Sequence, residues 1–303
     1  MPVNIPAGLP AVSALRAEKI FVMTEKRALA QGLRPLEIGL VNLMPTKIVT
    51  ETQFLRLLSN SPFQIEVHLL RMGSHVSKNT DPEHLKAFYR TFDQIKDKKL
   101  DGLIITGAPI ETLNFEDVNY WEELCQIMEW SKKSVQSTYH SCWGAQAALY
   151  YHYGVNKGPL DQKLFGIFLH KVLDPTSRLL RGFDDEFFAP HSRHTGIKQE
   201  DLERAGISVL SISQEAGVYI AANADRSQIF VTGHPEYDRL TLDGEYRRDI
   251  DRGLNINPPV NYYPGNDPAQ PPGIPWRAHG NLLFANWLNY YVLLRNGGFC
   301  NEQ

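Results

Sequence analysis

A cysteine near the middle of the chain has the setting of a catalytic nucleophile. Cys142 lies in YHSCWGAQAA, where a β-rich run ends and a run of small helix-forming residues begins. This predicts a nucleophile raised above a sheet on a tight turn, with space for the turn left by Gly144 and Ala145. The following helix N-terminus favours a thiolate, and the backbone N–H of Trp143 could donate to an oxyanion. The alternative is a small buried core residue, as most lone cysteines are.

A histidine and a glutamate further along the chain could serve that cysteine. VTGHPEY places His234 and Glu236 two residues apart at the end of a β-rich run. In an extended chain, such positions point the same way, so the carboxylate could fix the imidazole tautomer and stabilise the imidazolium. Alone, the pair could be an ordinary surface polar pair. Together with Cys142, it predicts a nucleophile, its base and a residue that orients the base.

Other chemical signals are weaker. The run ITGAPIE (105–111) is a strand end followed by a glycine turn, and ligands gather at the carboxyl ends of strands in an open parallel sheet. This turn could supply a second oxyanion N–H, or it could be an ordinary turn. His191 and His194 have no acidic or cysteine partner at metal-site spacing, so we expect no metal.

The surrounding pattern predicts an α/β fold. Expected strands at 36–44, 63–72, 100–109 and 134–142 alternate with expected helices at 50–60, 81–95, 118–133 and 143–154. Such alternation is typical of a mostly parallel sheet flanked by helices. Runs at 166–173, 207–224 and 227–237 predict further strands, several of them antiparallel, and a last helix covers 280–296.

The chain divides unevenly in this interpretation. We expect residues 1–35, with a short amphipathic piece around 14–30, to be an N-terminal extension packed on a single catalytic domain of residues 36–303. Residues 255–276 are rich in Pro, Asn and Gly and predict a long loop, which is usually either functional or disordered.

Composition narrows the class of protein. A hydrophobic content of 43% and a charged content of 21% are ordinary for a globular chain of 303 residues. The net charge of −3, with scattered basic residues, argues against nucleic acid or an anionic membrane as the main partner. Cys125, Cys142 and Cys300 show no C-x-x-C spacing, which favours a reducing compartment. With neither a signal-like start nor an apolar run of about 18 residues, we expect a cytoplasmic protein.

Five segments, in this order, resemble the homoserine O-acyltransferase family of methionine biosynthesis: LVNLMPTKIVTETQFLRLLSNSP, ITGAPIE, CWGAQAAL, FAPHSR and TGHPEYD. The resemblance runs from about residue 1 to about residue 295. It implies the class I glutamine amidotransferase-like (flavodoxin-like) fold and a homodimer. It also implies a ping-pong reaction in which Cys142 takes an acyl group from acyl-CoA, the co-substrate, with no other cofactor. His234, held by Glu236, then activates the side-chain hydroxyl of L-homoserine.

The resemblance also implies substrate-binding residues. The family's substrate-binding lysine falls on Lys163 in DQKLFG, and its specificity serine on Ser192 in PHSR. Its carboxylate-binding arginine falls on Arg248 in EYRRDI, although the adjacent Arg247 leaves that register open by one residue. A guanidinium suits this role because it binds a carboxylate bidentately. Lys47 is a plausible partner for CoA phosphates or, alternatively, an ordinary surface lysine.

One position bears on the acyl donor. The resemblance implies that glycine follows GAPI in succinyl-CoA users and glutamate in acetyl-CoA users, and this chain has Glu111. A carboxylate there would fill the acyl pocket and repel a succinyl group, so we predict a homoserine O-acetyltransferase. The alternatives are a homoserine O-succinyltransferase, a glutamine amidohydrolase or cysteine peptidase on the same fold, and a non-enzymatic binding protein. The last would not need the base and its orienting carboxylate.

Overall fold

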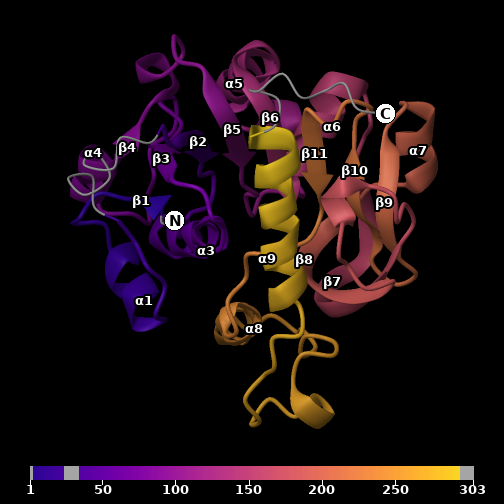
Figure 1. Ribbon diagram of the computed structural model, residues 1–303. Coiled ribbons are helices and arrows are strands. Elements are labelled where there is room, and N and C mark those ends of the chain that lie inside the picture. Colours follow the sequence, from indigo (N-terminus) through magenta and orange to yellow (C-terminus); the bar gives the residue numbers. More distant parts are fainter. Residues whose placement is uncertain (1–2, 24–33, 294–303) are drawn as a thin grey trace.

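The computed structural model describes residues 3–23 and 34–293, which are organised around one sheet of eleven strands (Figure 1). Its order is β1-β3-β2-β5-β6-β11-β10-β9-β7-β8, with β4 also paired to β3. The strands paired in parallel are β1 (Val3–Asn4), β2 (Leu36–Val41), β3 (Ile65–Leu70), β4 (Tyr89–Arg90), β5 (Leu100–Ile105), β6 (Val135–Ser141) and β11 (Gln228–Val231). The antiparallel strands are β7 (Gly158–Val172), β8 (Glu186–Gly196), β9 (Ser208–Ser213) and β10 (Gly217–Ala222).

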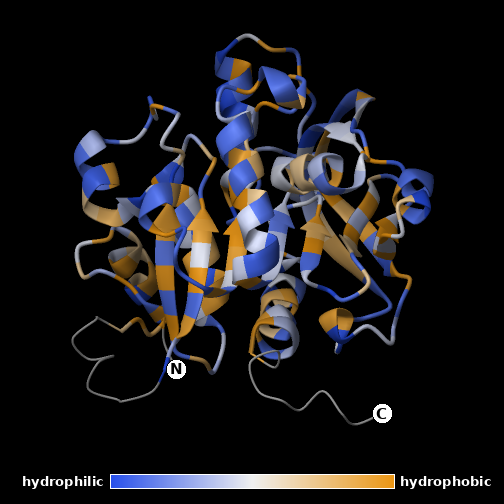
Figure 2. Cartoon of the chain, turned by 90° about the horizontal axis from the view of Figure 1, so that it is seen from above, coloured by the Kyte–Doolittle hydropathy of each residue, from blue (hydrophilic) through white to orange (hydrophobic). Residues whose placement is uncertain are grey.

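Helices cover both faces of this sheet. One face carries α1 (Ala11–Ala17), α3 (Lys47–Ser59) and α9 (Arg277–Trp287), and α9 crosses the sheet in the foreground of Figure 1. The other face carries α5 (Trp121–Ser134), α6 (Trp143–Tyr153) and α7 (Gln199–Arg204). Seen from above, the central strands are largely apolar, as expected for strands buried between two helical layers (Figure 2). The predicted mostly parallel α/β fold with antiparallel additions is confirmed.

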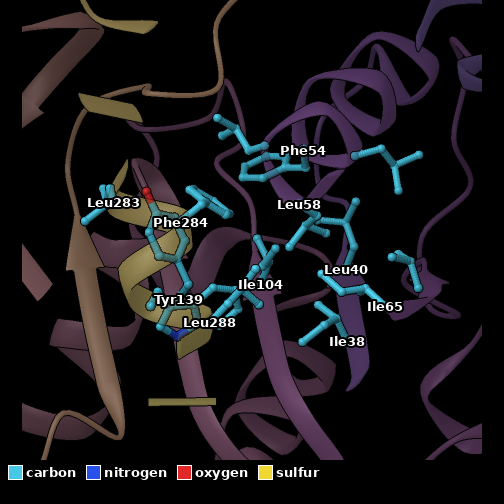
Figure 3. Packing of buried hydrophobic residues seen from close by; sticks show 14 of the residues in the cluster. Ile38, Leu40, Phe54, Leu58, Ile65, Ile104, Tyr139, Leu283, Phe284 and Leu288 are labelled. Atoms are coloured by element: carbon cyan, nitrogen blue, oxygen red, sulfur yellow. The ribbon is translucent and has the colours of Figure 1, made fainter. Parts of the chain in front are cut away.

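The core on the α3 and α9 face explains why these helices pack there. Ile38, Leu40 and Ile104 point from the strands toward Phe54 and Leu58 of α3, and Tyr139 lies among Phe284 and Leu288 at the α9 end (Figure 3). The rings of Tyr139 and Phe284 lie 4.8 Å apart between centroids. This packing fixes β6, the strand that leads into Cys142, from one side.

A second hydrophobic core, on the face of the sheet covered by α5 and α6, packs against β6 from the other side. In α5, the apolar residues Leu124, Ile127 and Met128 recur at helical spacing and are fully buried. Acidic residues in the first turn and lysines in the last turn complement the helix dipole. Helix α5, which connects β5 to β6 in the chain, therefore packs stably against this face of the sheet.

The long loop lies against the antiparallel half. Val260 donates its N–H to the carbonyl of Phe165 at 2.9 Å and accepts from the N–H of Ile167 at 2.8 Å. Between them, Gly166 has φ 146°, and a Cβ there would lie 2.4 Å from Val260 backbone atoms, so only glycine fits. The predicted 255–276 loop is therefore anchored on β7, and α8 (Thr241–Asp251) precedes it.

Three sequence-based boundaries need correction. The helix predicted at 81–95 is wrong beyond Phe88: α4 (Pro82–Phe88) begins at its Asp81 cap, and Tyr89 then turns extended to pair with β3. A short 3-10 turn, Phe92–Gln94, follows. The buried hydroxyl of Tyr89 donates to Glu51 and accepts from Asn42, and these tertiary contacts override helix propensity.

At the other two sites, the helix changes type or begins earlier than predicted. The last helix is α-helical only to Trp287 and continues as a π-helix over Leu288–Leu293. The N-terminal helix α1 lies earlier than the amphipathic piece predicted around 14–30, and β1 joins the sheet beside β3. Residues 24–33, residues 294–296 of the predicted last helix, and Cys300 lie outside the described residues. The domain boundary at residue 35 stays a prediction.

Within residues 3–23 and 34–293, we find no helix with the length and apolar character needed to cross a membrane.

Candidate active site

The turn around Cys142 is the strained elbow that the sequence predicts. Strand β6 ends at Ser141, and Cys142 occupies the N-cap of α6 with φ 49° and ψ −116°, a conformation that is costly for a residue with a Cβ. Its N–H donates to the carbonyl of Val231 at 2.7 Å, so the pairing of β6 with β11 continues into the elbow. The side chain is 8% exposed. The thiol is thus held at the carboxyl edge of the sheet, directly before a helix N-terminus.

Small neighbours make this elbow possible. A Cβ on Gly144 would lie 2.6 Å from the carbonyl oxygen of Thr106 and 2.9 Å from that of Ile105, so α6 touches the end of β5 through bare backbone. A Cβ on Gly107 would lie 3.1 Å from the Cβ of Cys142. The turn predicted to offer a second oxyanion N–H therefore lies against the nucleophile. The oxyanion roles of this turn and of Trp143 stay predictions.

Gly144→Ala tests the close approach of α6 to the backbone at the end of β5. Overpacking against backbone costs about 3 kcal/mol, and the gain in helix propensity returns about 1 kcal/mol, so we expect a net loss of about 2 kcal/mol. The measurement is the free energy of unfolding in urea. Gly158→Ala is the control, because no atom lies within 4 Å of its added Cβ. Equal stability of the two variants would contradict the close approach.

His234 and Glu236 meet as predicted, although not on a strand. Strand β11 ends at Val231, and both residues lie in the turn that follows. His234 Nδ1 and Glu236 Oε1 are 2.7 Å apart, and each side chain is only 5% exposed. The N–H of His234 donates to the carbonyl of Pro190 at 2.9 Å, which anchors the turn to β8. The contact therefore arises from a turn and not from the alternation of an extended chain.

The electrostatics of this pair favour an imidazolium. Burial alone would lower the pKa of His234, but the negative charges of Cys142 and Glu236, with their hydrogen bonds to the ring, raise it well above its ordinary value. Because Nδ1 faces Glu236, Nε2 is the nitrogen available to Cys142 and to a substrate. This arrangement can hold a thiolate–imidazolium pair and can move one proton between a substrate and the ring.

The three substrate-binding residues implied by the resemblance gather beside this pair. Lys163 comes from β7, Ser192 from β8 and Arg248 from α8, and the carboxylates of α8 connect them. Ser192 Oγ donates to Glu245 Oε2 at 2.5 Å. Lys163 Nζ lies 3.1 Å from Asp249 Oδ2 and 3.9 Å from Glu245 Oε2. Arg248 Nη2 lies 2.7 Å from Asp249 Oδ1, so the three residues form one polar cluster.

The adjacent arginine points elsewhere. Arg247 Nε binds Asp243 at 2.9 Å and its side chain is 59% exposed, away from this cluster. The geometry favours the register that assigns Arg248. The substrate roles of Lys163, Ser192 and Arg248 stay predictions.

Two residues that sequence reasoning missed link the cluster to the base. The ring of Tyr237 stacks on His234 with centroids 4.1 Å apart and planes 14° apart. Its hydroxyl donates to Glu245 Oε1 at 2.9 Å. Tyr237 could have been found, since it adjoins Glu236 in the sequence. Glu245 could not, because nothing in the sequence says which helix would face β7 and β8.

Lys47 is not an ordinary surface lysine, and that alternative is wrong. It lies in the first turn of α3, is 6% exposed, and its ammonium donates to the carbonyls of Asn42 and Met44. Burial lowers the pKa of Lys47 to about 8. A contact with CoA phosphates stays a prediction.

Glu111 is half-buried in the loop after β5. Its carbonyl accepts from Lys157 Nζ at 2.7 Å, so this loop is tied to the segment that follows α6. Burial lowers the pKa of Lys157, and the carboxylates of Glu111 and Glu116 oppose that shift. The Glu111 carboxylate therefore acts on a nearby cation, and its place in an acyl pocket stays a prediction.

No group of three or more His, Cys, Asp or Glu side chains that could hold a metal occurs among the described residues. His191 instead faces His170 in the interior, with their Nε2 atoms 3.0 Å apart.

Similarity to known proteins extends over nearly the whole chain. The family described as homoserine O-succinyltransferase matches residues 2–296. A homoserine O-acetyltransferase from Acetivibrio thermocellus is 60% identical over 293 residues, which cover 96% of each protein. A homoserine O-acetyltransferase from Petrotoga mobilis is 59% identical over 96% of this chain and 95% of its own.

Solved structures support the fold class. A glutamine amidotransferase from Thermotoga maritima aligns with a TM-score of 0.57 at 10% sequence identity. The alignment covers 86% of this chain and 100% of the Thermotoga maritima chain. The predicted amidotransferase-like fold is confirmed by this likeness, which concerns the fold alone. The match over residues 2–296 and the identities near 60% go further, and they show that the chain belongs to the homoserine O-succinyltransferase family.

Proposed function

We propose that this chain transfers an acetyl group from acetyl-CoA to the side-chain hydroxyl of L-homoserine, giving O-acetyl-L-homoserine for methionine biosynthesis. In the first half-reaction, the Cys142 thiolate attacks the thioester carbonyl and forms a carbon–sulfur bond. The carbon–sulfur bond to CoA then breaks, and the departing CoA thiolate takes the proton of the His234 imidazolium. The products are free CoA and an acetyl thioester on Cys142.

The second half-reaction needs a base because a neutral hydroxyl is a weak nucleophile. His234, now neutral, accepts the hydroxyl proton of homoserine as the oxygen attacks the acetyl carbonyl. The bond to Cys142 breaks, and the thiolate–imidazolium pair is restored. Glu236 holds the ring in the tautomer that this proton transfer requires. Lys163, Ser192 and Arg248 bind homoserine in this proposal, with the Arg248 guanidinium on its carboxylate.

One observation carries the mechanism: a strained Cys142 at a helix N-terminus hydrogen-bonds to the buried His234, which lies 2.7 Å from Glu236. The choice of acetyl is supported by the names of relatives that are 56–60% identical, homoserine O-acetyltransferases. Glu111 supports the same choice. The family to which the chain belongs is described as homoserine O-succinyltransferase, which makes that activity the second candidate.

The remaining parts of the proposal concern the setting of the enzyme. We propose a cytoplasmic homodimer that uses acetyl-CoA as co-substrate and needs no further cofactor. The absence of a C-x-x-C pattern supports a reducing compartment, and the net charge of −3 with scattered basic residues argues against an anionic membrane as the main partner.

The proposal is tested by trapping the thioester. Incubation with acetyl-CoA in the absence of homoserine should add one acetyl group to the peptide that contains Cys142, as measured by mass spectrometry. Adding homoserine should remove the acetyl group and give O-acetylhomoserine. Cys142→Ser should prevent this transfer. An adduct on Cys125 or Cys300, with none on Cys142, would contradict the mechanism.

A further inference from the structure

A buried arginine in β8 has no ion pair with any residue that the structure describes. Arg193 is 3% exposed, and no acidic side chain forms a salt bridge with it in the described part of the chain. Its guanidinium donates to the carbonyls of Thr195, at 2.6 Å, and Ala216. Its Nε lies 3.4 Å from His191 Nδ1. A buried cation without a counter-charge is costly, so this arrangement calls for a negative group nearby.

The two buried histidines behind Arg193 have fixed tautomers. His170 Nδ1 lies 2.9 Å from the carbonyl oxygen of Phe168, which can only accept, so Nδ1 carries the proton. His170 Nε2 must then accept from His191 Nε2, 3.0 Å away. That leaves His191 Nδ1 to accept from Arg193. Burial lowers the pKa of both rings, to about 4 for His170, which keeps them neutral. The hydrogen bonds therefore run one way, from Arg193 inward.

This network adjoins both the nucleophile and the base. The carbonyl of Thr195 that accepts from Arg193 also accepts from Gln146 Nε2 at 3.2 Å. The backbone N–H of Gln146 donates to the carbonyl of Cys142 at 3.2 Å, so Arg193 is connected to the first turn of α6. On the other side, the His191 ring lies 2.9 Å from where a Cβ on Gly233 would stand, next to His234.

The net charge of the active-site groups is consistent with a buried cation at Arg193. The buried groups of the active site include the carboxyl group of Glu236 and, in the proposed mechanism, the thiolate of Cys142. Burial lowers the pKa of Arg193 to about 10, and the negative charge of Cys142 opposes that shift. The guanidinium thus remains charged and balances the surplus negative charge of the thiolate, imidazolium and carboxylate.

We propose that Arg193 is a positioning residue that supplies the counter-charge for the Cys142 thiolate, and that His191 and His170 hold its guanidinium in place. The inference rests on the proposed function in taking Cys142 as the nucleophile. It adds a buried cation and a two-histidine support that contact no substrate.

The test reads the reactivity of Cys142 without any substrate. Iodoacetamide is uncharged and alkylates thiolates, so its second-order rate at Cys142, followed by mass spectrometry at neutral pH, reports the thiolate directly. We expect Arg193→Met to slow this rate about tenfold and Arg193→Lys, which keeps the charge, to slow it less than about threefold. A wild-type rate in Arg193→Met would overturn the proposal.

A second pair of variants keeps Arg193 but changes His191. These variants test the role of the guanidinium even if Arg193→Met does not fold. His191→Asn leaves an amide oxygen able to accept from Arg193 Nε, whereas His191→Leu leaves none. We expect near-wild-type alkylation in the first and about tenfold slower alkylation in the second. Equal rates in both would overturn the supporting role of His191.

Two controls separate this result from other causes. His68→Gln removes a buried histidine that is paired with Glu37 away from the site, and it should lower the melting temperature without changing alkylation of Cys142. A slower rate in this variant would attribute the effect to general loosening and overturn the proposal. If acetyl-CoA gives no adduct on Cys142 while the order of alkylation rates holds, the proposed function fails and the counter-charge stands.

Discussion

His234→Asn is expected to lower kcat by about ten thousandfold, because it removes the group that accepts the homoserine proton in the proposed mechanism. The loss should appear in both half-reactions, since the same ring also protonates the departing CoA. Glu236→Ala should cost about a hundredfold, because the ring remains but loses the partner that fixes Nδ1. The measurement is steady-state CoA release with saturating acetyl-CoA and homoserine, together with a single-turnover measurement of the acetyl adduct.

A matched control guards against a mere loss of stability. His84 is a buried histidine that pairs with Glu51 at 3.0 Å on α3, as His234 pairs with Glu236. His84→Asn should lower stability while kcat stays within about threefold of wild type. Wild-type turnover in His234→Asn near neutral pH would show that another group is the base.

Glu111→Gly is expected to change the preferred acyl donor. If the carboxylate lines the acyl pocket, a succinyl carboxylate would meet a like charge in a water-poor site at a cost of several kcal/mol. Because each 1.4 kcal/mol is about tenfold, the wild-type ratio of kcat/KM for acetyl-CoA over succinyl-CoA should fall by about a hundredfold or more in the variant. Acetyl transfer should weaken as the pocket loses its wall, and succinyl transfer should rise.

Glu116→Gly is the matched control for Glu111→Gly. Glu116 belongs to the same loop, and its charge also acts on Lys157, so the variant loses a neighbouring carboxylate without touching position 111. It should keep the wild-type donor ratio. An unchanged ratio in Glu111→Gly would remove Glu111 as the donor determinant and leave the succinyl-CoA alternative open.

The local sequence predicts the elbow well because its causes are local. A β-rich run, a cysteine and then small helix-forming residues leave few conformations other than a strand, a tight turn and a helix. The glycine at 144 follows from the same turn, where α6 touches the backbone of β5. Likewise, the apolar residues Leu100 and Leu103–Ile105 predict a buried strand, and β5 (Leu100–Ile105) is one.

Features set by distant contacts could not be predicted in this way. The end of α4 at Phe88 depends on a pocket for the Tyr89 hydroxyl formed by Asn42 and Glu51. Burial of Lys47 depends on where α3 begins relative to β2. No strand was expected over Glu186–Gly196, because Pro190 and the polar side chains of this segment hide the pattern of a strand that is held by pairing with β7. Arg193 lies in that strand, so its burial was equally hidden.

The pairing of β6 with β11 also dictates when the enzyme becomes reactive during its own synthesis. Tyr139 pairs with Ile229 and Ser141 with Val231, so the strand that ends at Cys142 gains this neighbour only after residue 231 has been added. Chains grow from the N-terminus at about 5–20 residues per second, and contacts between segments far apart in sequence form late. A nascent chain therefore carries the thiol for several seconds without its imidazole. In the proposed mechanism, the thiol therefore reacts with acetyl-CoA more slowly than in the folded chain until residues 228–236 have left the ribosome.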